Sequence, residues 1–231
     1  MVALPDDEAQ HLTRVLRLKR GSDVVVFDGR GREFEAVVEK AERSGALVAV
    51  GTPRAAGLRE PRVAVTLAQA VLKGDKMDDV VRDAVMMGAA AIQPIVTSRS
   101  EVTLAAVQRG RRRERWQRIA VSSAKQCGRA VVTPVLEAAT FGQIVEPRTI
   151  GPAVMFVEPG AGGTVTPVTS LALDPPTEVA VFIGPEGGWT PAEIEAGARV
   201  AHLVSAGSRT LRADAMATVV LASLFTLWKE F

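Results

Sequence analysis

Residues 178–193, EVAVFIGPEGGWTPAE, guide the interpretation of the rest of the chain. They begin with an apolar, strand-like run that ends in the glycine-rich sequence Ile183–Gly188. Thr190 and Glu193 then have the spacing of a capping box, with Pro191 at the first helical position, so a helix is expected to begin directly afterwards. A strand, a glycine-rich turn and a helix in this order are typical of open α/β folds, in which ligands bind at the carboxyl ends of strands.

The glycines of this turn let the backbone approach a ligand closely, and Glu186 adds a carboxylate to the same region. The alternative is a tight turn whose glycines serve geometry alone. Two further loops have a similar form, Glu158–Gly163 after an apolar run and Ala206–Asp214 before an apolar helix. We interpret the residues after Gly163 as a loop and not as the helix of a dinucleotide-binding fingerprint, because they include several prolines. Three such loops predict one composite small-molecule site.

Two domains are expected, with a boundary in a glycine- and proline-rich segment near residue 60. Residues 1–60 hold short β-rich runs separated by turns at Asp28–Gly31 and Ser44-Gly45, which predict an antiparallel meander or barrel. Residues 61–231 alternate apolar strand-like runs with helical patterns, among them a helix over about 104–126. This alternation predicts an α/β domain with a mainly parallel sheet and helices on both faces.

Basic residues are concentrated in one segment of a nearly neutral chain. The formal net charge is +2, yet nine lysines and arginines lie between Arg99 and Arg129, accompanied only by Glu101 and Glu114. Such a segment favours a polyanionic partner, because each neutralised phosphate releases condensed counterions. A solvated helix face is the alternative. The candidates for phosphate contact in this segment are Arg111, Arg112, Arg113 and Arg115.

The composition argues against several other classes of protein. With 47% hydrophobic and 23% charged residues, the chain has the make-up of a globular protein. A single cysteine, Cys127, excludes an intramolecular disulfide, and two histidines far apart give no reason to expect a metal site. The first residues, MVALPDDEAQ, lack the features of a secretory signal, and no window approaches the roughly 18 apolar residues of a membrane span. We therefore expect a cytoplasmic protein.

Several motifs occur together in a recognisable order. The most specific are Ile183–Gly188 and the G-x-R-x-L-R pattern of residues 207–212, which is followed by Asp214. Further matches are His11, Val15-Leu16-Arg17, Lys76-Met77-Asp78, Gly88, Pro94, Arg99-Ser100, Gln126–Arg129 and Pro134. This set, which covers nearly the whole chain, resembles that of the RsmE-type ribosomal RNA uridine-N3 methyltransferases, a family of the SPOUT class.

The resemblance implies a PUA-like RNA-binding barrel over residues 1–60 and a SPOUT methyltransferase domain with a trefoil knot over residues 61–231. It implies S-adenosylmethionine as cofactor, a homodimer, no metal, and small-subunit ribosomal RNA or the assembled subunit as substrate. The catalytic candidates are Glu186, Arg212 and Asp214. The cofactor-binding candidates are Val157, Glu158, Pro159, Ile183, Gly184, Pro185, Gly187, Gly188, Ala206, Gly207, Arg209 and Leu211. The RNA-binding candidates are His11, Arg14, Arg17, Arg99, Arg111, Arg112, Arg113, Arg115 and Arg129.

The chain departs from the family pattern at a few positions. Ala206 replaces the usual leucine, Asp214-Ala215 replaces Glu-Thr, Met86 stands where a glutamate is common, and the barrel looks shortened at its start. Two alternatives therefore stay open. One is a non-catalytic RNA-binding or ribosome-assembly protein with the same fold, and the other is a methyltransferase with a different RNA target.

Overall fold

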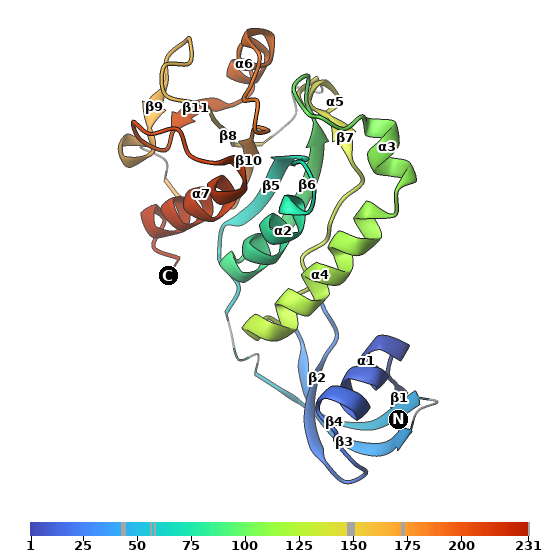
Figure 1. Ribbon diagram of the computed structural model, residues 1–231. Helices are drawn as coiled ribbons and strands as arrows, with labels where there is room; N and C mark the ends of the chain where they lie inside the picture. The colour runs from blue at the N-terminus through green and yellow to red at the C-terminus, as the bar shows by residue number, and fades with distance from the viewer. Residues whose placement is uncertain (43–44, 56, 58, 147–150, 172–173, 231) are drawn as a thin grey trace. The chain divides into compact units, whose positions relative to one another are not determined.

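The computed structural model describes residues 1–42, 45–55, 57, 59–146, 151–171 and 174–230. The chain divides into two compact units (Figure 1). One unit consists of Met1–Arg59 together with Gly128–Val132. The other consists of Glu60–Cys127 together with the chain from Thr133 onward.

The segment Gly128–Val132 is far from the rest of the first unit in sequence but is bonded to it. Gly31 N–H donates to Ala130 O, and Val132 N–H donates to Gly29 O, each at 3.0 Å. Both glycines have positive φ, 73° at Gly29 and 99° at Gly31, which allows the turn to present its backbone to the added segment. The first unit is therefore not one continuous stretch of chain.

The first unit contains a four-stranded antiparallel sheet in the order β1-β4-β3-β2. Its elements are β1 (Val2–Ala3), α1 (Asp6–Gln10), the π-helical η1 (His11–Val15), β2 (Asp23–Phe27), β3 (Glu33–Glu42) and β4 (Gly45–Arg54). Ala9 and Leu12 of the helical stretch are buried in one cluster with Val38 of the sheet. The antiparallel arrangement is confirmed, while Ser44 of the second expected turn lies outside the described residues.

The second unit is built on a seven-stranded sheet in the order β7-β6-β5-β10-β8-β11-β9, with every neighbouring pair parallel. Its strands are β5 (Ala64–Ala70), β6 (Ala91–Val96), β7 (Ala139–Thr140), β8 (Ala153–Phe156), β9 (Thr166–Pro167), β10 (Glu178–Ile183) and β11 (His202–Ser205). Its helices are α2 (Lys76–Met87), α3 (Leu104–Arg109), α4 (Arg112–Cys127), α5 (Phe141–Val145), the 3-10 helix η2 (Val168–Ser170), α6 (Pro191–Ala198) and α7 (Ala213–Leu227). The expected parallel α/β domain is confirmed, and the trefoil knot stays a prediction.

Helices cover both faces of this sheet (Figure 1). On one face, Phe141 of α5 and Ile194 of α6 pack into a core with Met155 and Phe182 of the strands. On the other face α2 packs against both α4 and α7. The buried side chains of α2 recur at helical spacing and form one apolar face: Met77, Val80, Val81, Ala84 and Val85.

The single helix expected over about 104–126 is wrong, because the structure has two helices there, α3 and α4. Gly110 ends α3 with φ −97° and ψ 64°, outside the helical region. Glycine in a helix interior costs about 1 kcal/mol relative to alanine, which favours a break at this position. Among the residues described, no helix is long and apolar enough to cross a membrane.

Candidate functional site

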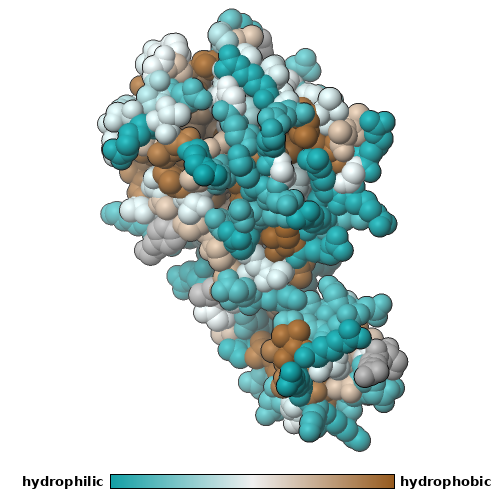
Figure 2. All heavy atoms as spheres, in the orientation of Figure 1, coloured by the Kyte–Doolittle hydropathy of each residue, from teal (hydrophilic) through white to brown (hydrophobic). Residues whose placement is uncertain are grey.

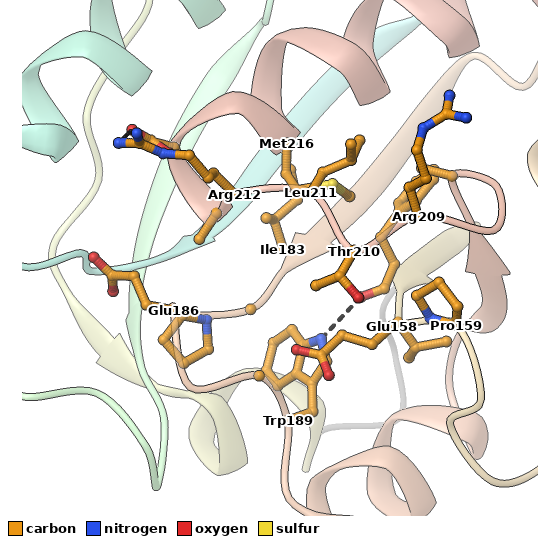
Figure 3. Close-up of a pocket in the computed structure, with 18 of the residues that line it drawn as sticks. Glu158, Pro159, Ile183, Glu186, Trp189, Arg209, Thr210, Leu211, Arg212 and Met216 are labelled. Atoms are coloured by element: carbon orange, nitrogen blue, oxygen red, sulfur yellow. Dashed lines mark hydrogen bonds and ion pairs between the residues drawn. The ribbon is translucent and has the colours of Figure 1, made fainter.

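One cavity lies at the carboxyl ends of four neighbouring parallel strands, β5, β10, β8 and β11. Its volume is about 220 Å³, and it is lined by the loops after β8, β10 and β11 and by the start of α7 (Figure 3). Lys76 at the start of α2 also belongs to the lining. Parallel strands present their carboxyl ends at one edge, so loops that are far apart in sequence come together. The three glycine-bearing loops meet here, as expected.

Most residues assigned to the site from the sequence line this cavity. The catalytic candidates in the lining are Glu186, Arg212 and Asp214. The cofactor candidates in the lining are Val157, Glu158, Pro159, Ile183, Gly184, Pro185, Gly188, Ala206, Arg209 and Leu211. Gly187 and Gly207 are described but stand outside the lining. The proposed roles of these residues stay predictions.

The lining also contains residues that sequence reasoning missed: Lys76, Phe156, Trp189, Thr210, Ala213 and Met216. Lys76 opens α2 and reaches the cavity from a segment 110 residues before Glu186. Its place in the Lys76-Met77-Asp78 match was the signal that could have found it. For Trp189 the signal was its position directly after the glycine-rich loop.

Glu186 accepts two hydrogen bonds from the start of α2 and the turn before it. Lys76 Nζ donates to Glu186 Oε1 at 2.8 Å, and the backbone N–H of Lys73 donates to the same oxygen at 3.2 Å. Burial alone would raise the pKa of Glu186, but the hydrogen bond from Lys76 and those from backbone amides outweigh it, so this pKa lies below its ordinary value. Glu186 is therefore a carboxylate at neutral pH, and both contacts leave its second oxygen, Oε2, to other partners.

Arg212 and Asp214 form a bidentate ion pair where α7 begins. Arg212 Nε donates to Asp214 Oδ1 at 3.0 Å, and Nη2 donates to Oδ2 at 2.7 Å. The hydrogen bonds from Arg212 hold the pKa of Asp214 below its usual range, and the same pair raises the pKa of Arg212. Both groups are thus ionised at neutral pH, and both oxygens of Asp214 are engaged.

Trp189 lines one side of the cavity and constrains the residues around it (Figure 3). Its indole Nε1–H donates to Phe156 O at 2.9 Å. A Cβ added at Gly184 would lie 3.0 Å from that nitrogen. Gly188 has φ 67°, and a Cβ there would collide with the carboxylate of Glu158. A close approach of Trp189 therefore favours glycine at 184, and the left-handed backbone conformation favours glycine at 188.

The residues after β6 fasten the glycine-rich loop to the start of α6. Arg99 Nη1 donates to Gly187 O at 2.8 Å and to Trp189 O at 3.2 Å. Ser98 N–H donates to Glu193 Oε1 at 2.8 Å, while the other carboxylate oxygen completes the expected capping box with Thr190. Burial would raise the pKa of Glu193, but hydrogen bonds from Ser98 and Thr190 outweigh it and lower this pKa. The guanidinium of Arg99, an RNA-binding candidate, is thus already bonded within the loop.

Three of the four phosphate-contact candidates in the basic segment form internal ion pairs. Arg113 Nη1 lies 2.7 Å from Glu137 Oε1, and Arg113 Nε donates to a backbone carbonyl at 2.9 Å. Arg115 pairs with Asp78. Arg111 Nε lies 3.3 Å from Glu114 Oε2. These three charges are at least partly neutralised within the protein.

Arg112 differs from its neighbours in α4. In the described part of the chain, no ion pair is found for Arg112 or for Arg109 of α3. Both line a second cavity of about 230 Å³ between α3 and the N-terminus of α4. Hydrophilic side chains predominate over these two helices (Figure 2). These arginines are the more available ones for an external anion.

The remaining RNA-binding candidates lie in the first unit. His11 and Arg14 are exposed on η1, and Arg17 is exposed just after it with φ 54°, a left-handed conformation unusual for a side-chain-bearing residue. Arg129 is 5% exposed and belongs to the segment that bonds to this unit. Three of the four candidates are therefore accessible within the unit.

A parallel α/β unit with a cavity built from three loops, and a small antiparallel unit before it in the chain, are the architecture expected of a SPOUT RNA methyltransferase, and the comparisons agree. A family model described as an RNA methyltransferase domain matches residues 59–225, and one described as an RNA methyltransferase PUA domain matches residues 4–50. The chain is 35% identical to ribosomal RNA small subunit methyltransferase E of Synechocystis sp., over 98% of this chain and 73% of that protein. It belongs to the family of ribosomal RNA small subunit methyltransferase E, as the motifs indicated.

Two solved structures are similar over nearly the whole chain. The enzyme of the same family name from Neisseria gonorrhoeae, bound to S-adenosyl methionine, is 28% identical with a TM-score of 0.85, covering 98% of this chain and 92% of that one. A methyltransferase from Legionella pneumophila in complex with the cofactor SAM is 27% identical with a TM-score of 0.86, covering 98% and 91%.

Proposed function

We propose that this protein transfers a methyl group from S-adenosylmethionine to N3 of a uridine in small-subunit ribosomal RNA. Family membership and the cofactor named for the two similar structures support methyl transfer to this class of RNA. The observation that carries the proposal for this chain is the ionised Glu186 in a cavity formed by three cofactor-type loops. N3 of uracil carries a proton and is a poor nucleophile until that proton leaves, so a positioned carboxylate is the group this reaction needs.

The residues around the cavity suit S-adenosylmethionine, which carries a sulfonium and an ammonium group. Ile183, Leu211 and Met216 offer apolar contacts, and the three loops bring backbone donors and acceptors to the same space. Glu158 contributes a carboxylate to the lining, which is complementary to a cationic ligand. When bound, this cofactor supplies an activated methyl group whose transfer leaves the electron pair of the C–S bond on sulfur.

Glu186 is the better placed of the two carboxylates to take the N3 proton. Among the described residues, the hydrogen bonds that other residues donate to this side chain use Oε1, so Oε2 can accept the proton as the N3 electron pair turns toward the methyl carbon. Asp214 has both oxygens bonded to Arg212, which makes it an orienting partner. Arg212 uses Nε and Nη2 in that pair, so Nη1 can donate to a uracil carbonyl and stabilise the developing anion.

For RNA binding, we propose four of the candidates for which no ion pair is found in the described part of the chain. These are the exposed His11, Arg14 and Arg17 in the first unit, and the half-buried Arg112 in the second. Arg99, Arg111, Arg113 and Arg115 contribute less, because a phosphate would have to compete with the bonds they already make. Phosphate contacts of this kind fix the orientation of the RNA without reading its sequence.

We propose a homodimer on the basis of the family resemblance and of one surface. Met86 of α2 and Val219 and Leu227 of α7 are 41%, 37% and 38% exposed on two helices that pack together. Large apolar side chains exposed on two packed helices support an interaction surface there. Sedimentation equilibrium is expected to give twice the mass of the chain, and Val219→Glu is expected to shift it toward the monomer.

The decisive experiment is transfer of labelled methyl from S-adenosylmethionine to small ribosomal subunits that lack their own uridine-N3 methylation, followed by nucleoside analysis. A 3-methyluridine product is expected, and Glu186→Gln should lower the rate by roughly 10²- to 10⁴-fold, the usual contribution of a general base. A different methylated nucleoside would show another RNA target. Cofactor binding without any transfer would favour the non-catalytic RNA-binding alternative.

A further inference from the structure

Lys76 connects the start of α2 to the glycine-rich loop through Glu186. Its ammonium lies 2.8 Å from Glu186 Oε1, and the two side chains are about equally exposed, at 36% and 35%. Lys76 also lines the cavity and acts electrostatically on Asp214. Lys76 therefore acts on both Glu186 and Asp214, the two carboxylates that border the site of the proposed proton transfer.

The charged groups near Glu186 come from three elements. From the segment before α2, Lys73 contributes only its backbone N–H, because its ammonium is paired with Glu101 at 3.1 Å. From the start of α7, the charge of Arg212 is balanced by its bidentate pair with Asp214. Lys76 is thus the cation that acts directly on the Glu186 carboxylate.

We propose that Lys76 is a positioning residue for this reaction: it holds Oε1 of Glu186, so that Oε2, for which no hydrogen bond from another residue is found in the described part of the chain, faces the uracil N3–H. The inference rests on the function proposed above. The geometry supports it because two hydrogen bonds, from the Lys76 ammonium and the Lys73 backbone N–H, hold Oε1 on the side of α2. Proton transfer then moves the N3 proton to Oε2, the N3 electron pair forms the new N–C bond, and the C–S electrons leave with sulfur.

The position of the acidic limb of the pH–rate profile tests this role. A carboxylate base is inactive when protonated, so transfer is lost as the pH falls through the pKa of Glu186. Without the Lys76 cation, burial still raises this pKa while the main opposing contact is gone. Lys76→Met is therefore expected to move the acidic limb to higher pH. At the pH that halves the wild-type single-turnover rate, we expect a loss of roughly five- to tenfold, the scale of one charge-assisted hydrogen bond in a partly exposed site.

Three further variants make the comparison specific. Lys76→Arg keeps the charge, so its acidic limb should lie at the same pH as that of the wild type. Lys76→Gln keeps a hydrogen-bond donor without the charge, so its acidic limb should lie between those of the wild type and Lys76→Met. Arg82→Met is the matched control: it removes a paired cation from the same helix at a residue that does not line the cavity, so the profile should stay unchanged. S-adenosylhomocysteine affinity is measured by calorimetry for each variant, because Lys76 lines the cavity, and the rates are compared at saturating cofactor.

A double-mutant cycle completes the test. In a Glu186→Gln background, Lys76→Met should have no further effect on the rate, since its partner is gone. An acidic limb of Lys76→Met or Lys76→Gln that coincides with that of the active wild type would overturn the role of Lys76. Equal losses from Lys76→Met with and without Glu186 would also overturn it. A wild-type enzyme that forms no 3-methyluridine would instead contradict the proposed function.

Discussion

The hydrogen bond from Trp189 to Phe156 O can be weighed by comparing two tryptophans of the second unit. Trp189 is 6% exposed and Trp228 is 2% exposed, and each packs against one phenylalanine. Trp189 Nε1 donates at 2.9 Å. Trp228 Nε1 is buried without a hydrogen-bond partner among the residues described. Replacing either indole by phenylalanine removes a similar volume, so the two changes differ mainly in the hydrogen bond.

The difference in stability between Trp189→Phe and Trp228→Phe follows from this contrast. The volume lost in each case costs roughly 1–2 kcal/mol, as is usual for small deletions in a packed core. Trp189→Phe also loses a buried hydrogen bond, which contributes about 1 kcal/mol. Trp228→Phe instead removes a desolvated donor without a partner, which relieves about 1 kcal/mol or more. Trp189→Phe should therefore be the less stable variant by about 2 kcal/mol.

Urea unfolding followed by far-UV circular dichroism measures this difference, with the free energy of unfolding extrapolated to water. Equal slopes for the two variants are required before their free energies are compared. Calorimetry with S-adenosylhomocysteine supplies a second readout: Trp189→Phe should weaken binding because the indole lines the cavity, and Trp228→Phe should not. Equal losses of stability, or a larger loss for Trp228→Phe, would refute the reasoning.

Three other outcomes are expected. Gly188→Ala should lower cofactor affinity and cost about 1–3 kcal/mol of stability, because φ is 67° and the new Cβ meets the Glu158 carboxylate; Glu158→Ala in the same chain should recover part of the loss in thermal unfolding. Arg112→Gln should reduce the log–log slope of RNA affinity against salt by about 1, whereas Arg115→Gln, already paired, should leave it nearly unchanged in filter binding. The pKa of Glu193 is lowered by folding, so its contribution to stability is present above the ordinary glutamate pKa and is lost as the pH falls below it. The gap in melting temperature between wild type and Glu193→Gln should accordingly be largest at neutral pH and close on acidification; a gap that stays constant would contradict this origin.

The sequence was most informative where structure depends on neighbouring residues. The capping box at Thr190 and Glu193 and the general alternation of strands and helices could be predicted, because they follow from local spacing. The meeting of the three loops also followed, since parallel strands end at one edge. The break at Gly110 was missed because a helical pattern continues on both sides of it.

Contacts between distant segments could not be predicted in the same way. Nothing in the spacing of residues indicates that Lys76 reaches Glu186, or that three of the four arginines in the basic segment are paired internally. The sequence shows how many charges a segment carries, and the fold determines which of them are available. For this reason the arginine run overstated the number of contacts it could offer to RNA.

The membership of Gly128–Val132 in the first unit has a consequence for how the chain matures on the ribosome. The residues up to Arg59 emerge early, but the backbone partners of Gly29 and Gly31 follow only when residue 132 has left the exit tunnel. Translation adds about 5–20 residues per second, so several seconds pass before Gly29 and Gly31 of the nascent chain can form these two hydrogen bonds. The first unit can therefore be completed only after α4 has been translated. A fragment that stops near residue 60 lacks Gly128–Val132, which belongs to this unit.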